Sequence, residues 1–105
     1  MLFMVVSTPR PERPSTMTDL RQSFWAWIEP HLASGLAKWT YARCGRGAVA
    51  LFDVESHETL HRLLNEWAEI IPATFEVHPL MEVAQSRKFL DEQAKTAASE
   101  RRSMS

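Results

Sequence analysis

The sequence predicts an α+β protein in which two β-α-β units follow one another, in the order βαββαβ, and share one antiparallel sheet. Three observations predict this. Short runs of β-branched and aromatic residues alternate with segments whose apolar residues recur every three or four positions. Pro and Gly mark the boundaries between them. A length of 105 residues, 45% of them hydrophobic, suffices for a single core.

Four segments have the character of strands. The first is apolar and ends at Pro9, and the fourth contains Pro79, which implies a sheet edge or a bulge. In the second, alternation places Ala37, Trp39 and Tyr41 on one side, and the Gly-Arg-Gly turn after it predicts a hairpin with the third. The predicted strands span residues 2–8, 36–43, 48–54 and 74–83.

Two segments have the periodicity of amphipathic helices. Ser15 or Thr16 can cap the first helix, and Gly35 is a natural stop for it. Pro30 should kink this helix or convert its last turn, because it removes a hydrogen bond. Ser56 can cap the second helix. The apolar stripes consist of Met17, Leu20, Phe24, Trp27 and Ile28 in the first helix and of Leu60, Leu63, Leu64, Trp67, Ile70 and Ile71 in the second.

This order of elements predicts a ferredoxin-like fold with both helices on one face of the sheet. The other face, which carries Trp39 and Tyr41, must then be covered. A third helix near the C-terminus has a narrow apolar side and is the one segment left for this, so we expect two copies to pack face to face. Residues 1–83 then form the domain, and residues 84–105 form a C-terminal helical extension and polar tail.

The composition argues against several classes of protein. A formal net charge of -1 is not that of a dedicated nucleic-acid binder, which neutralises phosphates with clustered Lys and Arg. The single cysteine, Cys44, excludes an internal disulfide, and the opening residues do not have a secretory signal pattern, so we expect a cytoplasmic protein. No stretch approaches the roughly 20 apolar residues of a membrane span, so no membrane partner is expected.

Several stretches carry a resemblance to a known family. Residues 1–3, 51–61 (LFDVESHETLH) and 75–80 (FEVHPL) resemble the muconolactone isomerase family. Residues 45–48 (GRGA) and 66–69 (EWAE) also resemble an uncharacterised group of small proteins with the same fold. These motifs are mostly structural, so they indicate the fold more strongly than the activity.

The resemblance implies a dimeric α+β barrel, often assembled into a larger ring. In the muconolactone isomerase family, a pocket between sheet and helices shifts a proton on a small lactone without a metal or an organic cofactor. The acid/base carboxylate of that family corresponds to a position near Phe24 here, and its first-strand histidine corresponds to Met4. The resemblance therefore implies a shared scaffold on which the chemistry has moved or been lost.

Three residues are candidates for catalysis. His31 lies on the apolar stripe of the first helix, where it could act as a general base or simply bond to a carbonyl that Pro30 has freed. Tyr41 and Arg43 could stabilise an oxyanion, or they could belong to an aromatic ladder at a dimer interface. Aromatic side chains can also stack on a flat substrate. The predicted substrate-binding residues are Phe24, Trp27, Trp39, Trp67 and His78.

The leading hypothesis is a cofactor-free enzyme of the isomerase or cyclase type, which acts on a small lactone, carbonyl-bearing or aromatic substrate with His31 as the base. The alternative is a non-catalytic small-molecule-binding or assembly module of the same fold. His57 and His61 have the spacing of two zinc ligands, but the sequence places no third ligand beside them, so no metal site is expected.

Overall fold

The computed structural model describes residues 1–104, with side chains up to Arg102. Its elements follow the predicted order, and a third helix completes the described chain. The strands are β1 (Leu2–Pro9), β2 (Ala37–Ala42), β3 (Ala48–Asp53) and β4 (Ala73–Leu80), and the helices are α1 (Thr18–Ser34), α2 (His57–Ile70) and α3 (Val83–Met104). A short 3-10 turn, η1 (Pro14–Met17), precedes α1.

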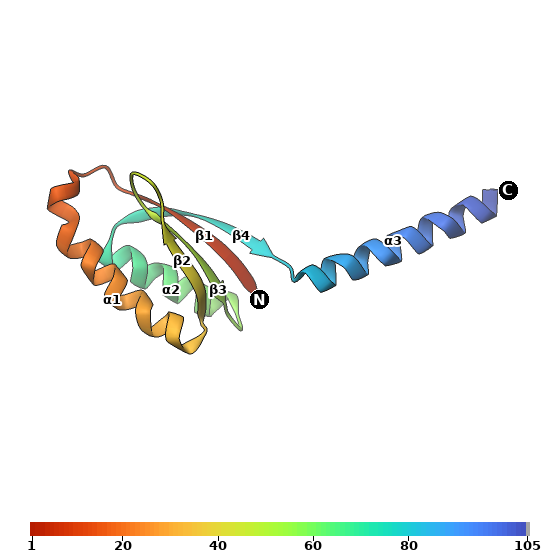
Figure 1. The fold of residues 1–105 in the computed structure, drawn as a ribbon, viewed down its shortest axis with the longest axis horizontal. Helices are drawn as coiled ribbons and strands as arrows, with labels where there is room; N and C mark the ends of the chain where they lie inside the picture. Colours follow the sequence, from red (N-terminus) through yellow and green to blue (C-terminus); the bar gives the residue numbers. More distant parts are fainter. Residues whose placement is uncertain (105) are drawn as a thin grey trace.

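The strands form one sheet in the order β2-β3-β1-β4, and every neighbouring pair is antiparallel. Helices α1 and α2 pack side by side on one face of this sheet (Figure 1). This is the ferredoxin-like arrangement that the sequence predicts. Pro79 lies in β4, at the edge of the sheet, where its missing N–H is tolerated as expected.

The covered face of the sheet forms a core dominated by aromatic rings. Trp67 from α2 is 2% exposed, and its ring centroid lies 4.8 Å from that of Phe24 and 5.1 Å from that of Phe75. Val5 and Phe52 are fully buried on the sheet beneath it. Burying one side chain of this size contributes about 1.5–3 kcal/mol, so the predicted apolar stripes hold the two layers together.

The helix ends agree with the sequence at two places and differ at one. The Ser56 side chain accepts a hydrogen bond from the amide of Thr59 at the start of α2, as predicted, and Gly35 ends α1 with a φ of 83°. The predicted cap of α1 is wrong. Ser15 and Thr16 both lie in η1, where the hydroxyl of Thr16 donates to a backbone carbonyl instead of capping the helix.

Helix α1 stays α-helical through Pro30 and ends at Ser34, so the predicted conversion of its last turn is wrong. Pro30 leaves the carbonyl of Ala26 without its helical donor. Ala26 is exposed, so solvent can take the place of that donor, and the helix keeps its form.

The predicted alternation of side chains along β2 is wrong at Ala37, because the strand has an irregularity between Ala37 and Trp39. Ala37 pairs with Phe52 of β3, whereas Trp39 pairs with Leu51, so the register shifts by one residue between them. As a result Ala37 is fully buried under the helices, while Trp39 and Tyr41 remain on the other face. A β-bulge of this kind turns one side chain to the opposite side of the sheet.

The second face of the sheet, called here the open face, is covered by no helix within residues 1–104. Its centre is apolar, because alternating positions of β1 and β3 place aliphatic side chains there. Tyr41 is 66% exposed. The residues of the open face include Leu2, Met4, Val6, Trp39, Tyr41, Val49, Leu51, His78 and Leu80.

Helix α3 projects away from the sheet along the direction of β4 and gives the molecule a longest dimension of 69 Å (Figure 1). Its Phe89 and Leu90 are 59% and 56% exposed. In the single chain α3 therefore leaves the open face uncovered. Within the described residues, no helix is both long and apolar enough to cross a membrane.

Candidate functional site

A pocket with a volume of about 200 Å³ lies between the helix-covered face of the sheet and the helices. It is at the end of this layer where β1 finishes, where η1 leads into α1, and where β2 turns into β3 (Figure 1). Its lining consists of Ser7, Pro9, Met17, Arg21, Phe24, Trp25, Ala42, Arg43, Gly45, Arg46, Gly47, Ala48, Trp67 and Ile71.

The turn between β2 and β3 forms one wall because it presses onto the end of β1. The amide of Arg43 donates to the carbonyl of Gly47 across the turn, at 2.9 Å. Gly47 has a φ of 90°, and a Cβ at this position would collide with the backbone oxygen of Ser7 and touch Pro9. Only glycine therefore allows the turn to approach β1 this closely.

Ser7 joins β1 to β3 beyond the last paired residues, Val6 and Val49. Its hydroxyl accepts from the amide of Ala48 at 2.9 Å and donates to the carbonyl of the same residue at 3.2 Å. Ser7 is only 2% exposed, so this side chain supplies the hydrogen bonds that the strand ladder no longer makes. It helps to hold the pocket wall in place.

Three arginines line the pocket, two from the β2–β3 turn and one from α1. Arg43 follows β2 and donates from Nη1 to the carbonyl of Ser7 at 2.7 Å. Arg46 lies in the turn and donates from Nη2 to the carbonyl of Arg10 at 2.9 Å, while its buried Nε has no hydrogen-bond partner in the described chain. Arg21 comes from α1. Together they place positive charge around one small cavity.

No acidic residue lines this pocket, and no described carboxylate forms an ion pair with any of the three arginines. Glu12, which follows β1, pairs with Arg10 instead, at 3.2 Å. The positive charge of the pocket is therefore not neutralised by the chain itself.

Aromatic rings form the opposite wall. Phe24 lies between Trp25 and Trp67, with ring centroids 5.1 Å and 4.8 Å away. Trp25 is half-exposed on α1, whereas Phe24 and Trp67 are buried. The pocket thus combines apolar ring faces with guanidinium groups, an arrangement that suits a flat molecule with a charged end.

The structure brings three of the predicted site residues to this pocket: Arg43, Phe24 and Trp67. His31 is not part of the lining. Its ring packs edge-on against Trp27, with centroids 5.1 Å apart, and Trp27 also lies outside the lining with a buried Nε1 that has no partner in the described chain.

The other predicted residues lie on the open face. Trp39 and Tyr41 pack against each other there, with ring centroids 5.7 Å apart. His78 forms a pair with Glu76, with Nε2 and Oε2 at 3.3 Å, on the same face. These three side chains are therefore separated from the pocket by the sheet.

Sequence reasoning missed most of the lining of the pocket, including Ser7, Arg21, Trp25 and Arg46. A signal existed for two of them, because Arg21 and Trp25 are four residues apart and so share one side of a helix. Ser7 and Arg46 had no such signal, because only the register of the sheet brings the β2–β3 turn to the end of β1.

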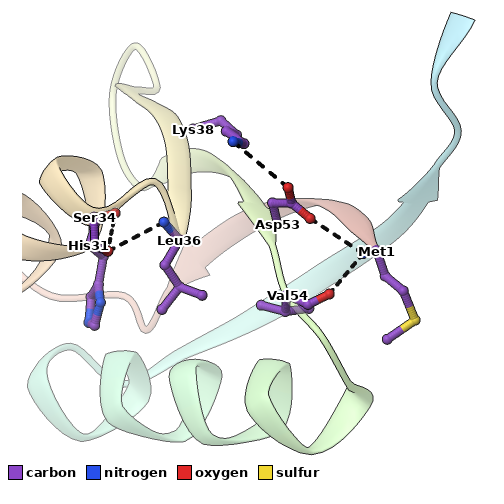
Figure 2. A network of polar contacts seen from close by, with 7 residues as sticks. All are labelled: Met1, His31, Ser34, Leu36, Lys38, Asp53 and Val54. Atoms are coloured by element: carbon purple, nitrogen blue, oxygen red, sulfur yellow. Dashed lines mark hydrogen bonds and ion pairs between the residues drawn. The ribbon is translucent and has the colours of Figure 1, made fainter.

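The opposite end of the layer is built differently, as Figure 2 shows. The N-terminal amine of Met1 lies 3.3 Å from Oδ1 of Asp53 and donates to the carbonyl of Val54 at 2.8 Å, and Nζ of Lys38 lies 3.8 Å from Oδ2 of Asp53. A wider, open hollow of about 470 Å³ nearby contains charged groups of both signs, among them Asp53 and Glu82 with the N-terminus. The carboxylate of Asp53 at this end is thus paired with two cations of the same chain.

The described residues contain no group of three or more His, Cys, Asp or Glu side chains arranged to hold a metal ion. His57 and His61 in particular are not joined by a third such residue within residues 1–104. Cys44 is exposed in the β2–β3 turn.

Comparisons with known proteins bear on this scaffold. Residues 1–94 match a family described as a domain of unknown function, DUF3303. No curated protein sequence matches the chain. The solved structure of muconolactone isomerase is similar, with a TM-score of 0.61 and 25% identity, over 78% of this chain and 90% of that one.

A second similar structure is 5-chloro-2-hydroxyhydroquinone dehydrochlorinase from Burkholderia phenoliruptrix AC1100, in complex with 2,5-dihydroxybenzoquinone. Its TM-score is 0.65 at 18% identity, over 81% of this chain and 98% of that one. These similarities confirm the ferredoxin-like fold and the resemblance to the muconolactone isomerase family.

Proposed function

The chain belongs to the DUF3303 family of domains of unknown function, and from that premise we propose that it is an enzyme of the isomerase or cyclase type. It would shift a proton on a small, planar, carbonyl-bearing molecule held between the sheet and the helices. The observation that carries this proposal is the pocket itself, which joins aromatic walls to three unneutralised arginines.

The size and walls of the pocket support a ligand with a single ring. A dry engineered cavity of about 150 Å³ binds benzene, and this pocket has a volume of about 200 Å³. Trp25, which is 42% exposed, offers a ring for stacking, and the buried rings of Phe24 and Trp67 support it from behind. The two similar structures are enzymes whose names point to small cyclic compounds, which supports the same class of substrate here.

The arginines support a reaction that develops negative charge. Removing a proton next to a carbonyl produces an enolate, and fixed donors aimed at its oxygen lower the barrier. Arg43 can fill this role from the pocket wall. His31 lies outside the lining, and no described lining residue is a His, Asp, Glu, Lys, Cys or Tyr. A water molecule in the pocket would therefore relay the proton, accepting it from one substrate atom as it returns a proton to another.

A turnover assay on small lactones and cyclic carbonyl compounds tests this proposal. The Arg43→Gln variant should lose about 10²–10³-fold in kcat, the effect of removing one oxyanion donor. The matched control is Arg62→Gln on the exposed side of α2, which should keep full activity. His31→Ala should keep activity within about threefold, because its ring is outside the pocket.

Two results would contradict the proposal. Loss of activity in His31→Ala with retention in Arg43→Gln would move the chemistry away from this pocket. Absence of both turnover and ligand binding would favour a non-catalytic module.

The open face supports a second function, assembly with another copy of the same chain. Its centre is apolar and aromatic, and charged groups such as Asp53 and Glu76 stand toward its margins. An apolar centre with a polar rim is the composition of a homodimer interface, and an exposed sheet face of this kind is unfavourable for a lone chain. We propose a second copy as the occupant, packed face to face.

Sedimentation equilibrium at micromolar concentration tests the assembly. The protein should be a dimer or a larger oligomer, and Tyr41→Lys should shift it toward the monomer because a charge would be buried. Gln22→Lys, on the exposed side of α1, is the control and should not change the mass. A well-folded monomer of the unmodified protein at this concentration would contradict the proposal.

A further inference from the structure

We propose that the ligand of the pocket is a small organic anion, a planar ring that carries a carboxylate, and that Arg21, Arg43 and Arg46 form the site for its charge. This inference rests on the proposed function, because it concerns the same pocket. It adds that the ligand carries a negative charge, a property that neither the aromatic walls nor the fold determines.

The charge around the pocket is unbalanced. Three guanidinium groups line one cavity of about 200 Å³, and no acidic side chain lines it. The described chain pairs acidic groups with cations elsewhere, as at Glu12 with Arg10 and at Asp53 with Lys38. Arginines left without carboxylates around a concave site attract an anion from solution.

The three guanidinium groups also have free hydrogen-bond donors. Within the described chain, Arg43 uses only Nη1 as a donor and Arg46 uses only Nη2. The Nε of Arg46 is buried without a partner, and a buried donor without an acceptor is unfavourable. The side chain of Arg21 forms no ion pair with another described residue, and no side-chain hydrogen bond within that part of the chain. A guanidinium presents its donors in a planar fork that matches a carboxylate.

The arginines lie on two sides of the aromatic wall of the pocket. Arg21 and Trp25 are one helical turn apart on α1, so the aromatic wall and one cation share the same side of that helix. Arg43 and Arg46 face them from the β2–β3 turn. A ring stacked on the aromatic wall would thus have its carboxylate between cations from two sides. An inorganic anion would use the cations and leave the aromatic wall without a contact.

Tryptophan fluorescence titrations with a matched pair of probes test the inference. Benzoate carries the charge, and benzamide has the same ring and shape without it. Benzoate should quench the fluorescence and bind at least about tenfold more tightly than benzamide. Raising NaCl from about 0.05 to about 0.5 M should weaken the binding of benzoate and leave that of benzamide nearly unchanged.

Variants then assign the charge to the arginines. Arg21→Gln should weaken benzoate binding about tenfold, as expected for one lost charge-assisted hydrogen bond. This variant removes no hydrogen bond of the folded chain, so circular dichroism should show an intact fold. Arg46→Gln should act in the same direction, and Arg62→Gln is the control on α2 that should bind like the unmodified protein.

The outcomes separate this inference from the function on which it rests. Equal binding of benzoate and benzamide would overturn the anion site and leave a neutral-ligand pocket. Binding of neither would overturn both. Full displacement of benzoate by inorganic phosphate at lower concentration would also overturn the inference, because the site would then recognise a phosphoryl group and not a carboxylate on a ring.

Discussion

The two ends of the layer between sheet and helices hold their charged groups in opposite ways. At the end with the N-terminus, Asp53 is shared by the amine of Met1 at 3.3 Å and by Lys38 at 3.8 Å, so cation and anion belong to the same chain (Figure 2). At the other end, Arg21 and Arg43 line a pocket to which no described residue contributes a carboxylate. The same fold thus has one neutralised end and one positive end.

The difference indicates which end is structural and which is available to a ligand. Partly exposed ion pairs such as those of Asp53 contribute roughly 0–1 kcal/mol and complete the local structure. Arg43 and Arg46 each donate to a backbone carbonyl, but the three guanidinium charges have no carboxylate partner among the described residues and repel one another. Their arrangement is explained better by an external anion than by stability.

The largest expected effect concerns the turn that forms the positive end. Gly47→Ala should lower the free energy of unfolding by about 2–5 kcal/mol, because the new Cβ meets the backbone of Ser7 and the residue has a positive φ. Gly45→Ala is the matched control, since Gly45 also has a positive φ but has open space around it, and about 1 kcal/mol is expected. Urea denaturation measures both, and equal losses would contradict the close approach of the turn to β1.

Ser7→Ala should have the next largest effect. It leaves the buried amide of Ala48 without its acceptor, which should cost about 1–3 kcal/mol of unfolding free energy. Ser23→Ala, where the lost hydroxyl bonds to a carbonyl on the exposed surface of α1, should change stability by less than about 0.5 kcal/mol. A Ser7 variant as stable as the Ser23 variant would show that the pocket wall does not depend on this hydroxyl.

A carboxylate built into the positive end should make it resemble the other end. Trp25→Glu places an acid one helical turn from Arg21, so it should compete with benzoate and weaken its binding. Trp25→Gln removes the same ring without adding charge. The Glu variant should bind benzoate about tenfold more weakly than the Gln variant in an isothermal titration. The same affinity in both would mean that only the ring matters at this position.

The smallest effect is expected at the neutralised end. Asp53→Asn removes the carboxylate shared by Met1 and Lys38, both of which are partly exposed, so stability should fall by less than about 1 kcal/mol. Benzoate affinity should not change. Thermal unfolding and the same titration measure these two quantities. A clear loss of benzoate binding in this variant would show that the two ends are not independent.

The sequence was sufficient to predict the order of helices and strands. It was not sufficient to predict local irregularities within a strand or at the start of a helix. Alternation and helical periodicity predicted the order βαββαβ, and Ser56 and Gly35 predicted two helix ends correctly. The bulge before Trp39 and the 3-10 turn at Thr16 escaped prediction. Both depend on tertiary packing, because they bring Ala37 into the core and Met17 to the pocket.

The candidate site was predictable only in part. Phe24 and Trp67 lie on helix stripes that the periodicity reveals, and both line the pocket. His31 shares the stripe of α1 with Phe24, but the pocket is near the start of this helix and His31 is near its end. Arg46 was not assigned to the site, because only the register between β1 and β3 places its turn beside Ser7.

The crystal structure of the protein with benzoate tests the central claim most directly. The account predicts the carboxylate within hydrogen-bond distance of at least two of Arg21, Arg43 and Arg46, with the ring against Phe24 and Trp25. Benzoate bound at the end near Asp53 or on the open face, with the arginine pocket empty, would contradict it.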